Sequence, residues 1–147
     1  MASRILVVCL GNTCRSPMGQ GVLEARAAEA GLEIAVDSAG IGAWHAGNPP
    51  NPRGVAAARA RGYDTSAQRS RQIRPADFHD FDLILAMDAS NVADLRRLAP
   101  DGARAVIRLF HPDGLDIPDP YHGGPEDYEH ALDMIEHAAA RLVVDLA

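Results

Sequence analysis

Short apolar runs alternate with longer amphipathic stretches along this chain. Runs of mostly apolar residues predict buried β-strands at residues 4–8, 32–36, 82–86 and 105–109. Residues with helical spacing predict α-helices at 17–30, 53–61, 90–98 and from 125 to the end. Strands that alternate with helices indicate a parallel sheet with helices on both faces. We therefore expect one three-layer α/β/α domain over residues 1–147, with a four-stranded parallel sheet.

A short loop joins the first predicted strand to the first predicted helix, and its sequence is Cys9-Leu10-Gly11-Asn12-Thr13-Cys14-Arg15-Ser16. Such a loop directs backbone N–H groups and the positive end of the helix dipole at one point, which predicts an anion site. The same field favours the charged, nucleophilic form of Cys9. Arg15 has a planar guanidinium that can bind two phosphoryl oxygens at once. Ser16 can donate its hydroxyl to the Cys9 sulfur, so the loop is suited to a nucleophilic attack on phosphorus.

This loop resembles that of the low-molecular-weight protein tyrosine phosphatases, whose signature near the N-terminus contains Cys, Gly-Asn and Cys-Arg-Ser-Pro. A second segment, Ile117-Pro118-Asp119-Pro120-Tyr121, is similar to the Asp-Pro-Tyr loop that supplies the general acid of that family. Other segments resemble the second strand of the family, the wall of its substrate pocket and its central strand with the following turn: Asp37-Ser38-Ala39-Gly40, Trp44-His45-Ala46-Gly47, and residues 81–88 with Asn91. The resemblance covers nearly the whole chain.

The resemblance implies that the protein hydrolyses phosphotyrosine in proteins through a phosphocysteine intermediate. In that mechanism Cys9 attacks phosphorus, and Asp119 protonates the leaving oxygen and then activates water. Arg15 and the loop N–H groups stabilise the equatorial oxygens. The loop positions expected to bind phosphate are Leu10, Gly11, Asn12, Thr13, Cys14 and Ser16.

Further residues are expected to support the loop or to flank the substrate. By resemblance, Asn12 and Ser38 hold the loop backbone through side-chain hydrogen bonds, and Asp88 is a weaker candidate for the same role. Trp44 and Tyr121 are predicted to lie on either side of a flat substrate ring. A position in the core is the alternative for Trp44, but the glycine-rich loop around it favours the pocket.

Thr13 leaves the substrate open between phosphotyrosine and phosphoarginine. Tyrosine-specific relatives commonly have Ile at this position, whereas the family's protein-arginine phosphatases resemble this chain in having Thr. Trp44 and Tyr121 resemble the tyrosine-specific members, so we favour phosphotyrosine. Arsenate reduction on this fold requires two more cysteines after the loop, and none follows Cys14. A non-catalytic phosphate-binding module would be expected to lose Cys9 or Asp119, and both are present.

Cys14 has two interpretations of its own. It can pack beneath the loop as a small apolar residue, or it can form a reversible disulfide with Cys9 that protects the thiolate from deeper oxidation. A disulfide between such close neighbours would be strained and easily reduced. We favour the redox function, so Cys14 is predicted to take part in both phosphate binding and oxidation.

Composition adds limits on partners and location. The formal net charge of −6 argues against non-specific nucleic-acid binding. No apolar stretch reaches about 18 residues and the N-terminal segment lacks the apolar region of a signal peptide, so we expect a cytoplasmic protein that does not enter a membrane. We expect a phosphorylated protein as the partner, and a monomer or a weak homodimer. No metal or organic cofactor is expected, because no convincing ligand set is formed by His79, His111, His122, His130 and His137.

Overall fold

Four parallel strands form the central sheet of the protein. The computed structural model describes residues 3–147. The strands are β1 (Ser3–Cys9), β2 (Ile34–Gly40), β3 (Leu83–Ala86) and β4 (Val106–Leu109), in the spatial order β2-β1-β3-β4. All three neighbouring pairs are parallel. The predicted four-stranded parallel α/β fold is confirmed.

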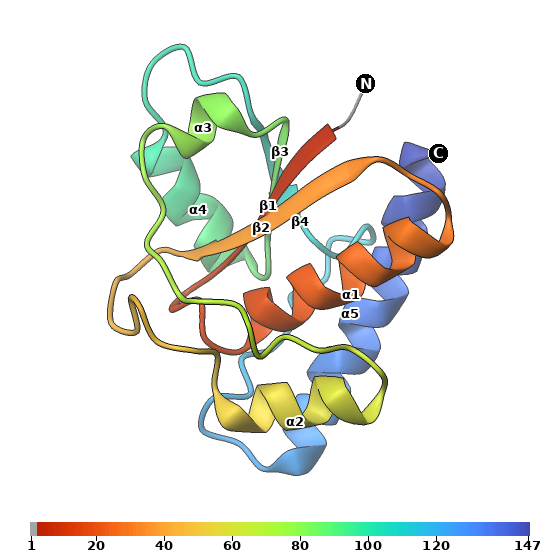
Figure 1. Cartoon of the computed structure of the whole chain (residues 1–147). Helices are drawn as coiled ribbons and strands as arrows, with labels where there is room; N and C mark the ends of the chain where they lie inside the picture. The colour runs from red at the N-terminus through yellow and green to blue at the C-terminus, as the bar shows by residue number, and fades with distance from the viewer. Residues whose placement is uncertain (1–2) are drawn as a thin grey trace.

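Helices cover both faces of this sheet. They are α1 (Arg15–Glu29), α2 (Pro52–Ala60), α3 (Asp77–Asp80), α4 (Ala89–Leu98) and α5 (Pro125–Leu146). Figure 1 shows α1, α2 and α5 on one side of the sheet and α3 and α4 on the other. Each connection between strands that are consecutive in the chain contains at least one helix, as is usual for parallel strands.

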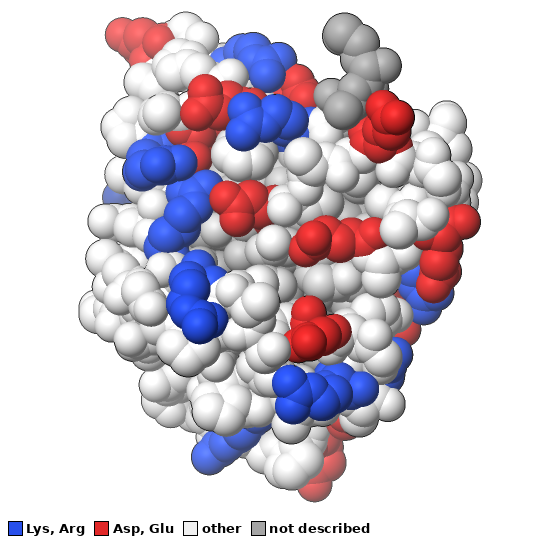
Figure 2. All heavy atoms as spheres, viewed as in Figure 1, with Lys and Arg blue, Asp and Glu red and all other residues white. Residues whose placement is uncertain are grey.

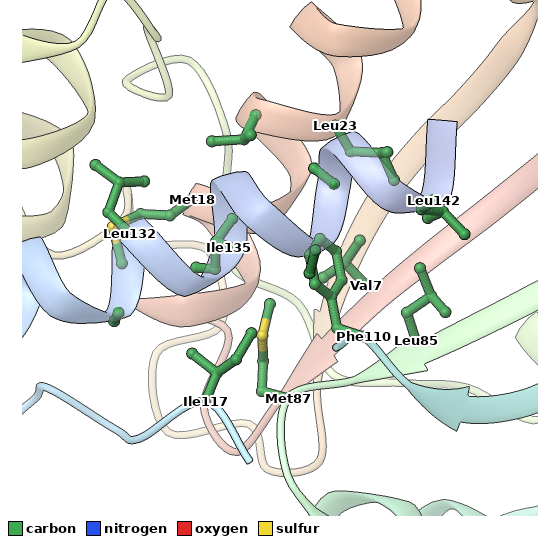
Figure 3. Close-up of a cluster of buried hydrophobic side chains, with 14 of the residues drawn as sticks. Val7, Met18, Leu23, Leu85, Met87, Phe110, Ile117, Leu132, Ile135 and Leu142 are labelled. Carbon is green, nitrogen blue, oxygen red and sulfur yellow. The ribbon is translucent and has the colours of Figure 1, made fainter. Parts of the chain in front are cut away.

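The two faces of β1 build two separate hydrophobic clusters. Ile5 and Val7 face α1 and α5, whereas Leu6 and Val8 face α3 and α4, and all four side chains have no exposed surface. A strand buried on both faces is apolar at every position, which explains the continuous run in the sequence. Figure 3 shows the larger cluster, in which side chains of α1 and α5 meet the sheet; it labels Val7, Met18, Leu23, Leu85, Met87, Phe110, Ile117, Leu132, Ile135 and Leu142.

Two elements differ from the sequence-based prediction. The second strand runs from Ile34 to Gly40 and not over residues 32–36, because it pairs with the whole of β1 up to Cys9. The polar residues Asp37 and Ser38 interrupt the apolar pattern there. The short helix α3 was not predicted, since four residues are too few to show helical spacing. It begins with Asp77, whose buried carboxylate accepts a 2.8 Å bond from the Arg74 backbone N–H.

The carboxyl ends of all four strands meet at one edge of the sheet. Cys9 is aligned with Gly40 of β2, and Val8 is aligned with Ala86 of β3. The residues directly after these strand ends therefore come together although they are far apart in the sequence. This edge positions the candidate site.

The surface carries charges of both signs. Arginines and acidic residues are interspersed on the face seen in Figure 2 and do not form a single basic region there. Within residues 3–147, no helix has both the length and the apolar character needed to cross a membrane.

Candidate active site

The loop between β1 and α1 contains the two cysteines of the chain, and both side chains are buried. Cys9 is 3% exposed, and its sulfur lies 3.1 Å from the hydroxyl oxygen of Ser16 in the first turn of α1. The Ser16 oxygen also accepts a 2.7 Å bond from the Asn12 side chain, so its own proton is available for the Cys9 sulfur. The Ser16 hydroxyl is therefore placed to donate to the Cys9 sulfur.

Asn12 holds the loop in an uncommon backbone conformation. Its φ of 53° lies in the left-handed region, which Asn adopts more readily than most residues other than Gly. The buried side-chain amide donates to the Ser16 and Ser38 hydroxyls at 2.7 and 3.0 Å, and its oxygen accepts from the Arg71 backbone N–H at 2.9 Å. These bonds connect the loop to β2 and to residues 70–72.

The segment around Ser70 supports the loop in a manner that the sequence did not reveal. The buried Ser70 hydroxyl donates to the Asn12 backbone carbonyl. Its backbone also bonds Gly47 and Asn48 of the neighbouring loop, both within 2.9 Å. Because these contacts are made by side chains and backbone groups from distant parts of the chain, neither periodicity nor local spacing could predict them.

Gly40 at the end of β2 lies against the same loop. A β-carbon at position 40 would be 2.8 Å from the Gly11 carbonyl carbon and 2.9 Å from the Asn12 nitrogen, closer than such atoms approach in proteins. Both neighbours are backbone atoms and cannot rotate away. Glycine is therefore required here by space alone.

We predict that Gly40→Ala displaces the loop between β1 and α1. It should lower kcat/KM at least tenfold and destabilise the fold by about 1–3 kcal/mol, as overpacking does elsewhere. Steady-state kinetics and urea denaturation measure the two effects. Gly47→Ser is the matched control on stability. Position 47 has a positive φ but open space around it, so this substitution should destabilise the fold through backbone strain and leave kcat/KM unchanged. Equal kcat/KM for Gly40→Ala and the parent would contradict the steric argument.

Arg15 is buried at the start of α1 and points to three acceptors. Its Nη1 donates to Asp88 Oδ2 at 2.7 Å and to the Ile117 carbonyl at 2.9 Å, and its Nη2 lies 3.6 Å from Asp119 Oδ2. Burial acts to lower the pKa of Arg15, but the Cys9 sulfur and the carboxylates of Asp88 and Asp119 raise it above its ordinary value. Arg15 is thus a fixed cation. Asp88 supports Arg15, whereas we expected it among the residues that hold the loop backbone.

Asp119 lies on the loop between β4 and α5. Its Oδ1 accepts a 3.1 Å bond from the Tyr121 backbone N–H, while Oδ2 faces Arg15. The side chain is 42% exposed, so it can exchange protons with solvent and with a bound group. The Ile117 carbonyl that binds Arg15 belongs to the same loop, two residues earlier. One guanidinium therefore connects the loop that contains Cys9 to the loop that contains Asp119.

A cavity of about 390 Å³ opens above these groups. It is lined by Leu10, Gly11, Thr13, Trp44, His45, Asp119, Tyr121 and His122. Trp44 is 69% exposed, which excludes the core position for it. His122 was absent from the predicted site, and His45 was named only as part of the segment that resembles the pocket wall; the His45 ring lies 5.9 Å from that of Tyr121, centre to centre. Within residues 3–147, none of the cavity residues belongs to a cluster with metal-ligand spacing.

One known protein family matches almost the entire chain. Residues 4–147 match the family model described as low molecular weight phosphotyrosine protein phosphatase. The chain belongs to this family.

Curated relatives and solved structures align with this chain over nearly their full length. A low molecular weight protein-tyrosine-phosphatase of Streptomyces coelicolor is 40% identical, with 97% of this chain and 93% of that protein covered. The structure of Vibrio vulnificus Wzb in complex with benzylphosphonate superposes with a TM-score of 0.90 and 34% identity, covering 98% and 99% of the two chains. The Drosophila arginine phosphatase DARP also superposes with a TM-score of 0.90, at 32% identity and 96% coverage of both chains.

Cys14 of this phosphatase contacts a residue of α5. Its sulfur lies 3.5 Å from the hydroxyl oxygen of Tyr128, which is 1% exposed. Burial raises the pKa of the Cys14 thiol to about 11, partly opposed by this bond to Tyr128. Burial and the same contact raise the pKa of Tyr128 as well. At neutral pH both groups are therefore protonated, and Cys14 is a thiol.

Proposed function

We propose that this phosphatase hydrolyses phosphotyrosine in proteins through a phosphocysteine formed on Cys9, with Asp119 as general acid and general base. The arrangement around Arg15 supports this proposal most strongly. Arg15 follows the Cys9 loop directly and lies 3.6 Å from Asp119, so one cation links the two groups that the reaction needs. The aromatic side chains of Trp44 and Tyr121 at the cavity supply apolar surface for a phenol ring.

In the first step the Cys9 sulfur attacks phosphorus and the bond from phosphorus to the phenolic oxygen breaks. Asp119 gives its proton to that oxygen, so tyrosine leaves as a neutral phenol. Arg15 and the loop N–H groups, together with the positive end of α1, stabilise the three equatorial oxygens as charge moves. The products of this step are phosphocysteine and dephosphorylated protein.

In the second step water attacks phosphorus from the side that the phenol has left. The Asp119 carboxylate accepts a proton from that water, and the sulfur–phosphorus bond breaks. Inorganic phosphate leaves, and Cys9 returns as a thiolate with the Ser16 hydroxyl as its hydrogen-bond donor. Asp119 is protonated again for the next cycle, so protons and charges balance over the two steps.

Phosphoarginine is the second candidate substrate. Thr13 lines the cavity and is 9% exposed, and its hydroxyl could bond a guanidinium nitrogen of the leaving group. A relative of 32% identity is named an arginine phosphatase. The exposed Trp44 beside the cavity favours an aromatic substrate instead, so phosphotyrosine is the primary proposal.

Turnover of matched peptides tests this proposal. We would measure kcat/KM without added metal on two peptides that differ only in carrying phosphotyrosine or phosphoarginine, with Cys9→Ser and Asp119→Ala as controls. A Cys9-dependent preference for phosphotyrosine is expected. Thr13→Ile should increase that preference, since Ile removes the hydroxyl and adds apolar surface. A preference for phosphoarginine would change the substrate and keep the mechanism, whereas no Cys9-dependent turnover of either peptide would refute both.

The second cysteine gives a prediction about oxidation, which rests on the proposed nucleophile. When peroxide converts Cys9 to a sulfenic acid, the Cys14 thiolate can attack the Cys9 sulfur; the sulfur–oxygen bond breaks, hydroxide leaves and takes up a proton from water, and a disulfide forms. This attack needs the deprotonated thiol, so closure should become faster as the pH rises from neutral toward about 11. Tyr128→Phe removes the bond that lowers the pKa of Cys14, so it should slow closure at neutral pH.

Recovery of activity measures this effect. After peroxide treatment, dithiothreitol should restore most activity in the parent, less in Tyr128→Phe and least in Cys14→Ser. Treatment at alkaline pH should reduce the difference between the parent and Tyr128→Phe. If all three proteins recover equally, Cys14 has no redox function and packs beneath the loop.

A further inference from the structure

Two histidines and an aspartate meet near β4, the strand at one edge of the sheet, and outside the cavity described above. His111 and Asp113 follow β4, and His137 lies in the middle of α5. One ligand atom from each residue lies within 4.8 Å of the corresponding atoms of the other two. The two imidazole rings are 5.6 Å apart between centres and tilted by 31°. From this geometry we propose a divalent metal site, with Zn²⁺ as its preferred ion.

His111 is the fixed member of this group. It is 5% exposed, and neither the proposed chemistry nor the substrate cavity uses it. Its Nδ1 accepts a 3.2 Å bond from the Asp113 backbone N–H, which fixes the orientation of the ring beside Asp113. An imidazole binds a metal ion through a nitrogen lone pair. Coordination through Nδ1 replaces that long hydrogen bond, and coordination through Nε2 requires the other tautomer. Either change gives up the hydrogen bond from the Asp113 N–H.

The other two ligands are free to adjust. Tetrahedral zinc with bonds near 2.1 Å holds its ligand atoms roughly 3.3 Å apart, somewhat closer than in this structure. His137 and Asp113 are exposed, so rotation of their side chains can provide the remaining approach. One oxygen of Asp113 contacts the Arg141 guanidinium at 3.3 Å in an exposed pair that is easily exchanged. The second oxygen is available to the metal.

The ligand types select the class of ion. Two imidazole nitrogens and one carboxylate oxygen suit zinc, which completes a tetrahedron with a water molecule. Magnesium and calcium prefer sets made of oxygen alone and would bind poorly here. The ion would connect the segment after β4 to α5. Ile117, whose carbonyl binds Arg15, lies four residues after Asp113, so the ion would also restrain the loop that contains Asp119.

Titration with zinc tests the site. All measurements use the full chain with Cys9→Ser, because the Cys9 thiolate would itself bind zinc. Calorimetry should show one equivalent of Zn²⁺ bound, and the melting temperature should rise with zinc concentration, as it does for any ligand of the folded state. Adding His137→Gln should weaken binding at least tenfold and remove the rise. His130→Gln is the matched control: His130 is exposed on the same helix, and its loss should change neither result.

The rings of the ligands provide a direct readout. The imidazole signals of His111 and His137 should shift on addition of zinc in two-dimensional ¹H–¹⁵N spectra, whereas those of His45 and His122 at the cavity should not. The absence of saturable zinc binding in the micromolar range would overturn the proposal. So would equal affinity in the His137→Gln and His130→Gln proteins, or shifts confined to the cavity histidines. None of these results depends on phosphatase activity, so the site and the proposed function can fail separately.

Discussion

A Cys9→Ser variant should lose about ten-thousand-fold or more of the activity on phosphotyrosine peptides, the largest effect that we expect from any single substitution. A serine hydroxyl at this position is a far weaker nucleophile than a thiolate, and no other group at the cavity can replace it. The substitution is small, and the bonds from Asn12 to Ser16 and Ser38 do not involve the Cys9 sulfur. We therefore expect the loop to keep its shape.

This retained shape makes the prediction specific. The loop N–H groups and Arg15 should still bind inorganic phosphate in Cys9→Ser, and calorimetry should detect it at an affinity within tenfold of the parent. Cys14→Ser is the matched control, because it removes the other loop sulfur and should keep most turnover under reducing conditions. If Cys9→Ser retains more than a small fraction of the parent kcat, or if Cys14→Ser is the inactive variant, the nucleophile has been assigned wrongly.

Asp119→Asn should lower kcat/KM by about 10²- to 10⁴-fold on phosphotyrosine, because the phenolate must then leave without a proton. The loss should depend on the leaving group. Aryl phosphates whose phenols are strongly acidic need little protonation, so p-nitrophenyl phosphate should be affected much less than phosphotyrosine. A plot of log kcat/KM, which reports the step that forms phosphocysteine, against the pKa of the leaving phenol should be nearly flat for the parent and steeply negative for Asp119→Asn.

The structure also indicates why Asn is the appropriate substitution. An Asn side-chain oxygen can still accept from the Tyr121 backbone N–H, so the loop conformation should be preserved while the acid is removed. Asp116→Asn is the control on the same loop, because Asp116 binds the Ala89 backbone and does not reach the cavity. An equal loss of kcat/KM on all aryl phosphates would contradict a role in protonating the leaving phenol and would indicate instead that Asp119 positions Arg15.

The sequence contained most of the fold because the relevant signals are local. β1 is buried on both faces, so its apolar run was continuous, and the loop after it has its chemistry in eight consecutive residues. Cys9 and Arg15 could be found together for that reason. Asp119 could be found only through the resemblance of its loop, since an Asp-Pro pair alone is ordinary turn chemistry.

The contacts between distant segments could not be predicted in this way. Ser70 bonds Asn12 across 58 positions, and the Arg71 backbone bonds the Asn12 side chain. His111 and His137 come from a loop and a helix that only the tertiary fold brings together, so the histidines were judged not to form a metal set. Asp37 and Ser38 hid the end of β2, because the Ser38 hydroxyl bonds Asn12 of the loop and the Asp37 carboxylate pairs with Arg71, so neither side chain serves the core. Residues that serve the site thus interrupt the apolar spacing from which strands are predicted, and contacts between distant segments leave no local pattern.

The position of Trp44 allows ligand binding to be followed by intrinsic fluorescence. It is the one tryptophan of the chain, it is largely exposed, and it borders the cavity. All indole fluorescence therefore originates at the entrance to the proposed substrate site. An aromatic phosphate that stacks there removes the ring from water, so the emission maximum should move to shorter wavelength as the site fills. With Cys9→Ser, where substrate is bound but not consumed, this signal would give equilibrium affinities for unlabelled phosphopeptides directly.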